Sequence, residues 1–67
     1  MNRSANGRWL VVYMCRDRQK AMDMEKLLTD EGFLVRSQVM GGEDTYEIHA
    51  LESEAQEARN FILENGL

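Results

Sequence analysis

The side chains best suited to binding a ligand in this sequence form a short basic run, Arg16, Arg18 and Lys20, on both sides of Asp17. The stretch that follows has the spacing of a helix, so the run would lie at a helix start. Backbone N–H groups there, together with two arginines, can bind a phosphate or a carboxylate. We therefore treat Arg16, Arg18 and Lys20 as a candidate site for a small anion. The commoner alternative is a solvated helix start capped by Asp17.

Cys15 is the other chemically active group near this point, and it ends the apolar run before the helix. Positive neighbours and a helix start favour a thiolate, which would make Cys15 reactive. The commoner role of a free cysteine is that of a small buried hydrophobe. Because the sequence has a single cysteine, no internal disulfide can form.

His49 is the single histidine, and Glu47 lies two residues before it on the same side of a predicted strand. The pair could act as a general base or supply half of an intersubunit metal site. A surface or interface histidine is the commoner case. One histidine and one cysteine exclude a closed zinc site built from these two residue types. We predict no catalytic residues, no metal site, no cofactor and no enzyme activity.

The elements that must position these groups begin with an apolar, β-branched and aromatic run, which predicts a strand over residues 8–15. Asp17 is the expected N-cap of a helix over residues 18–31, and Gly32 is expected to end it. The apolar residues of that helix follow helical spacing. They are Ala21, Met24, Leu27 and Leu28.

The second half of the chain predicts a β-hairpin followed by a helix. Alternating residues indicate strands over 33–40 and 45–50, joined by a turn at 41–44. Ser53 is the expected cap of a helix over 54–65, which Gly66 ends. The inward-facing residues of this half would be Phe33, Val35, Val39, Tyr46, Ile48, Ala50, Ala55, Ala58, Phe61 and Ile62.

These elements predict an α+β fold, a ferredoxin-like split β-α-β-β-α sandwich that lacks its fourth strand. The expected sheet order is 1-3-2 with both helices on one face. The first strand would then lie at an edge, and the second face of the sheet would have no helix. Strict alternation places Trp9, Val11 and Tyr13 on one side of that strand. We expect these three residues to form a dimer interface, through either the strand edge or the open face.

Length and composition indicate one soluble domain, over residues 8–67, after a disordered arm at 1–7. The net charge of −4 argues against nucleic acid as a partner. No apolar run approaches the roughly 20 residues needed to cross a bilayer, so we expect no membrane partner and a cytoplasmic location.

Four short stretches resemble a family of bacterial domains described as putative prokaryotic signal-transducing proteins. They are Trp-Leu-Val-Val-Tyr (9–13), Lys-Leu-Leu-Thr-Asp-Glu-Gly (26–32), Tyr-Glu-Ile-His-Ala (46–50) and Glu-Ser-Glu-Ala-Gln-Glu-Ala (52–58). The resemblance implies a small bacterial regulatory domain with a role in signal transduction, and it implies no defined active site.

The function we expect is a non-catalytic regulatory or protein-interaction module that acts as a homodimer and contacts another protein. The alternative is a sensor of a small anionic metabolite, held at the start of the first helix by Arg16, Arg18 and Lys20. An enzyme ranks third, because about 60% surface burial in a chain of this size leaves little room to enclose a pocket.

Overall fold

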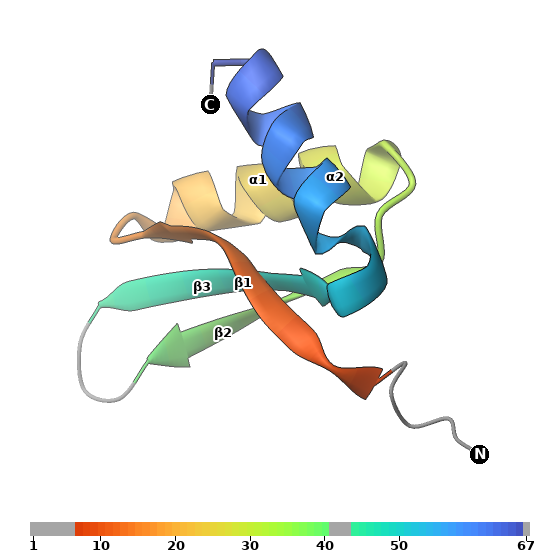
Figure 1. The fold of residues 1–67 in the computed structure, drawn as a ribbon. Coiled ribbons are helices and arrows are strands. Elements are labelled where there is room, and N and C mark those ends of the chain that lie inside the picture. The colour runs from red at the N-terminus through yellow and green to blue at the C-terminus, as the bar shows by residue number, and fades with distance from the viewer. Residues whose placement is uncertain (1–6, 41–43, 67) are drawn as a thin grey trace.

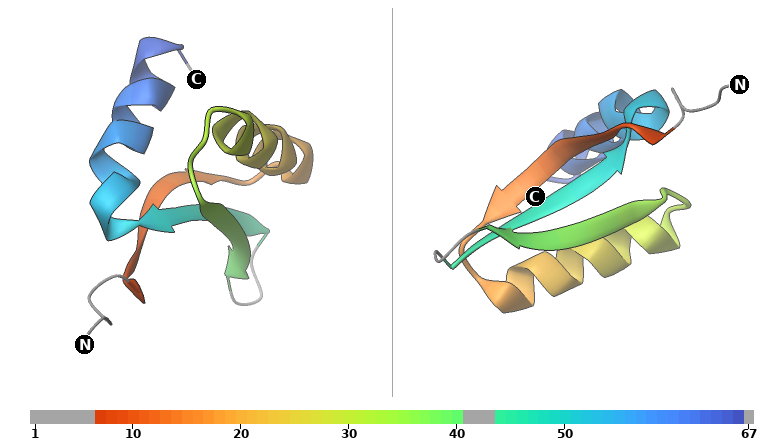
Figure 2. Two further views of the ribbon diagram at one scale, coloured as in Figure 1. Left: turned by 90° about the vertical axis from the view of Figure 1, so that its right-hand side faces the viewer. Right: turned by 90° about the horizontal axis from the view of Figure 1, so that it is seen from below.

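The fold is a three-stranded antiparallel sheet with two helices packed on one side of it (Figure 1). The computed structural model describes residues 7–40 and 44–66. Its elements are β1 (Trp9–Cys15), α1 (Arg18–Asp30), β2 (Val35–Met40), β3 (Thr45–Leu51) and α2 (Glu52–Glu64). The strand order β1-β3-β2 and the β-α-β-β-α sequence of elements confirm the predicted architecture. The views in Figure 2 show α1 and α2 crossing the same face of the sheet.

Helix α1 begins at the residue that the sequence indicated. One carboxylate oxygen of Asp17 accepts hydrogen bonds from the backbone N–H groups of Gln19, at 2.9 Å, and Lys20, at 3.3 Å. These bonds satisfy N–H groups that have no partner within the helix. The side of α1 that faces the sheet buries Ala21, Met24 and Leu28.

The other end of α1 is closed by a glycine in the left-handed region. Gly32 has a φ of 104°, a conformation that costs a residue with a Cβ atom considerably more. This turn lets the N–H groups of Gly32 and Phe33 return to the carbonyls of Thr29 and Leu28, both at 3.0 Å. The paired bonds form a Schellman motif, which directs the chain from α1 into β2.

Helix α2 does not begin at the predicted cap. β3 runs directly into the helix, so the N-cap position falls on Leu51 and has no side-chain cap, and Ser53 lies inside the first turn. The N–H of Glu52 donates instead to the carbonyl of Arg8, at 2.9 Å. Glu52 and Glu54 carry negative charge into the first turn, which suits the positive end of the helix dipole. The expected stripe is largely buried, with Ala55, Ala58 and Ile62 inside.

The core is a single thin layer between the sheet and the two helices. It contains no buried polar or charged residue in the described part of the chain. Half-buried apolar side chains surround this layer, Phe33 and Phe61 among them. The buried residues are Ala21, Met24, Leu28, Ile48, Ala50, Ala55, Ala58 and Ile62.

A β-bulge in β1 corrects the predicted facing of that strand. Val11 pairs with His49 and Tyr13 pairs with the next residue of β3, Ile48, so Val12 is the extra residue. Such an insertion shifts the alternation by one position. Tyr13 therefore shares the helix side with Ile48 and packs against the core, while Val11 lies on the opposite side. Periodicity in the sequence cannot reveal this shift, because nearly every residue of the strand is apolar.

Two predictions concern residues that are wholly or largely outside the described part of the chain. The expected disordered arm covers residues 1–7, of which only Gly7 is described. The expected turn covers residues 41–44, of which only Asp44 is described.

Candidate functional site

The start of α1 does not bring Arg18 and Lys20 to one site. Arg18 and Lys20 are exposed, and they line two different hollows, beside β2 and beside Tyr13 respectively. Arg16 is exposed as well. The carboxylate of Asp17 already accepts hydrogen bonds from the first helical N–H groups and places a negative charge where an anion would bind. This geometry favours a capped, solvated helix start.

The side of the sheet that faces away from the helices is the most distinctive surface, and we call it the open face (Figure 1). Strand pairing defines its members, because residues opposite one another point to the same side of a sheet. Val11, Met14 and Met40 have exposed fractions of 38%, 58% and 38%. The open face consists of Trp9, Val11, Met14, Arg36, Gln38, Met40, Thr45, Glu47, His49 and Leu51.

Glu47 and His49 form a hydrogen-bonded pair at the centre of the open face. His49 Nε2 lies 2.9 Å from Glu47 Oε1, and the two side chains are only 12% and 16% exposed. His49 Nδ1 is buried and has no hydrogen-bond partner among residues 7–40 and 44–66. The predicted proximity of these residues is confirmed. The pair is enclosed by its own sheet, since Val11 and Arg36 stand on either side of His49 in the neighbouring strands.

A second contact joins the two outer strands across the middle one. The guanidinium carbon of Arg36 lies 4.5 Å from the ring centroid of Trp9. Arg36 is in β2 and Trp9 is in β1, so this cation–π contact spans β3 between His49 and Leu51. The stack covers part of the open face and helps to explain the low exposure of His49.

The free edge of β1 carries two features that hinder pairing with another strand. The bulge at Val11 and Val12 breaks the regular repeat of backbone groups. Arg59 of α2 donates from Nη2 to the carbonyl oxygen of Val11, at 2.8 Å. The sequence predicted the exposed edge but not its protection, because Arg59 is 48 residues away from its acceptor.

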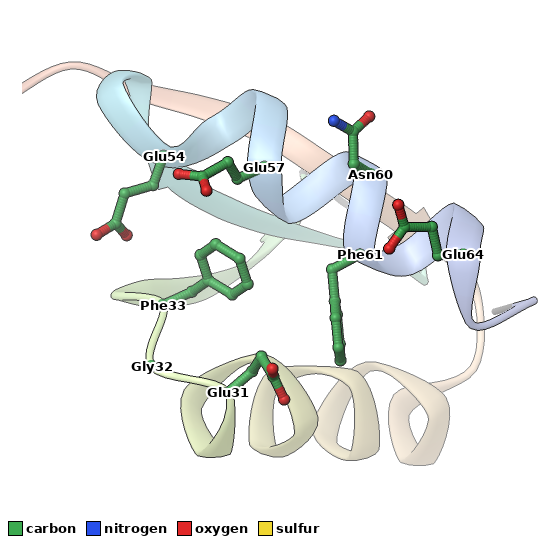
Figure 3. A pocket seen from close by; sticks show the side chains of 8 residues that line it. All are labelled: Glu31, Gly32, Phe33, Glu54, Glu57, Asn60, Phe61 and Glu64. Atoms are coloured by element: carbon green, nitrogen blue, oxygen red, sulfur yellow. The ribbon is translucent and has the colours of Figure 1, made fainter.

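A shallow groove of about 530 Å³ lies between α2 and the connection from α1 to β2 (Figure 3). Its floor contains Phe33 and Phe61, whose ring centroids are 6.2 Å apart, and Phe61 points from α2 toward α1. Glu31, Glu54, Glu57 and Glu64 surround these rings. The groove is therefore negative and does not suit the anionic ligand considered above. A cluster of carboxylates does not by itself define a ligand site, and we assign none.

The remaining candidate, Cys15, is a half-buried residue that packs against the core. Its Sγ donates to the backbone carbonyl of Asp17, at 3.3 Å. This contact ties the end of β1 to the start of α1, which is a structural role. Among the described residues no cluster of three or more histidine, cysteine, aspartate or glutamate side chains could hold a metal ion. No described helix is long and apolar enough to span a membrane.

Comparisons with models of protein families, with curated proteins and with solved structures find no match to this chain. The resemblance to bacterial signal-transducing proteins thus stays a prediction. The contacts that sequence reasoning missed are Arg36 with Trp9 and Arg59 with Val11. Both join residues from distant elements, and no local pattern signals either of them.

Proposed function

We propose that this chain is a non-catalytic regulatory or protein-interaction module that acts as a homodimer. The observation that carries the proposal is the one-sided cover of the sheet: α1 and α2 lie on the same face, and apolar side chains remain exposed on the other. Exposed apolar side chains grouped on one surface and bordered by polar residues are typical of interaction sites. Association is also a common way for small domains with thin cores to gain stability.

The groups that could support chemistry favour this proposal over an enzyme. His49 and Glu47 bond to each other, Cys15 is packed against the core, and the basic run surrounds a helix cap. A catalytic site needs a nucleophile and a base within reach of a shared substrate position. The described residues place His49 on the open face and Cys15 on the helix side of the sheet, so these two groups do not share one pocket.

Sedimentation equilibrium over micromolar to millimolar concentrations tests the proposal. We expect the mass to rise from 7.8 kDa toward twice that value as the concentration increases. The Val11→Lys variant should need a higher concentration to associate, since Val11 borders both the edge and the open face. A monomer mass for the native chain at every concentration would refute the homodimer.

A further inference from the structure

We infer that two copies of the chain associate through the open faces of their sheets rather than through the edges of β1. This inference rests on the proposed homodimer and specifies its surface. Trp9 and Val11 remain in the interface, while Tyr13 leaves it because the bulge turns this residue toward the helices.

Edge-to-edge association is hindered by the backbone of β1. An added strand needs a regular row of free N–H and C=O groups. The bulge interrupts that row at Val11 and Val12, in the interior of a strand of seven residues. The Val11 carbonyl is already occupied by the Arg59 guanidinium. An edge dimer would have to form around the bulge and displace this hydrogen bond.

The open face has the apolar groups that association requires. Val11 and Met14 lie along β1, and Met40 lies at the far end of β2, so exposed apolar side chains stand on both outer strands. The charged groups between them already have partners within the chain, in the Glu47–His49 bond and the Arg36–Trp9 stack, whereas His49 Nδ1 has none among the described residues. Covering this face therefore leaves the charged groups of these two contacts with their partners.

Charge favours the open face over α2 as the surface that meets a second copy. The chain carries a net charge of −4, and α2 contributes four glutamates against Arg59, so approach through α2 is repulsive. The open face carries one cation, Arg36, and one carboxylate, Glu47, which balance each other. In a two-fold arrangement the same patch meets itself, and a patch whose charges balance does not repel its own copy.

The size of the face indicates a weak dimer. Strands about 4.8 Å apart and about 3.3 Å long per residue give a three-stranded surface of roughly 14 by 23 Å, or ~300 Å² of flat area per copy. Stable interfaces bury about 800 Å² of accessible surface per partner, so this interface belongs to the small, transient class. We therefore expect association in the micromolar range or weaker.

The deciding variant is Met40→Lys, because Met40 is on the open face but belongs to β2, at the opposite edge from β1. We expect it to raise the dissociation constant about tenfold or more in sedimentation equilibrium. Leu63→Lys is the matched control: Leu63 is 76% exposed on α2, away from the open face, and its variant should dimerise like the native chain.

Arg59→Ala also distinguishes edge pairing from open-face pairing, because it is expected to strengthen the first and leave the second unchanged. It frees the Val11 carbonyl, so edge pairing would become tighter, whereas open-face pairing should be unchanged. Circular dichroism checks that each variant is folded, and Gln38→Lys, an exposed open-face position in β2, replaces Met40→Lys if the latter unfolds. A native dimer that Met40→Lys leaves intact and Arg59→Ala tightens would overturn the open-face interface while the homodimer stands. A native chain that is monomeric throughout would overturn both.

Discussion

The adjacent leucines of α1, Leu27 and Leu28, offer a sharp test of the packing described above. Both belong to the apolar stripe that the sequence predicts, yet their exposed fractions are 37% and 0%. Replacing a fully buried leucine with alanine costs about 2–5 kcal/mol, through lost burial and the cavity left behind. A domain of this size is typically stable by only about 3–5 kcal/mol. Leu28→Ala should therefore remove most or all of the stability.

Leu27→Ala is the matched control, because the same atoms are removed one position earlier from a side chain that is partly in solvent. Its expected cost is about 1 kcal/mol. If Leu28→Ala is unfolded, its loss of stability cannot be measured, and Ile48→Val then provides a measurable loss from the same core. Ile48 is also fully buried, and this smaller change should cost about 0.5–1.5 kcal/mol.

The assay is urea denaturation followed by circular dichroism, at one low protein concentration because self-association would add apparent stability. We expect the denaturation midpoint to fall far more for Leu28→Ala than for Leu27→Ala. Equal losses for the two leucines would refute the assigned orientation of α1 on the sheet. So would a native-like midpoint for Leu28→Ala.

Three further outcomes follow from the same structure. Asp17→Ala should cost about 1 kcal/mol in thermal unfolding because it removes a cap, whereas Ser53→Ala should change stability by less than about 0.5 kcal/mol. Gly32→Ala should cost about 1–2 kcal/mol, since a Cβ is strained at positive φ even where no neighbour obstructs it. Inorganic phosphate should not raise the melting temperature; a rise that disappears in an Arg16→Ala, Arg18→Ala double variant would instead support the anion sensor.

The local elements of this fold follow from short-range chemistry. Asp17 caps α1 because its carboxylate accepts hydrogen bonds from backbone N–H groups in the first turn. Gly32 ends α1 because a residue without a Cβ atom readily adopts the positive φ of the C-terminal turn. Both effects act within four positions of the residue. The sheet order also follows from the sequence, since a crossover and a short hairpin leave few economical arrangements. The same reasoning failed at Ser53, where β3 continues into α2 and moves the cap position to Leu51.

The sequence alone thus determined the order and type of the elements, the edge position of β1 and the open face of the sheet. Only the tertiary structure decided which side chains of β1 occupy that face, because the bulge depends on pairing with β3. Val11 and its partner His49 are 38 positions apart in the chain, and no local pattern encodes their pairing. The protection of the edge was likewise a tertiary outcome, since Arg59 reaches Val11 only after α2 has packed beside β1. Periodicity reports a residue's neighbours along the chain, whereas register and long-range hydrogen bonds depend on which segments meet in space.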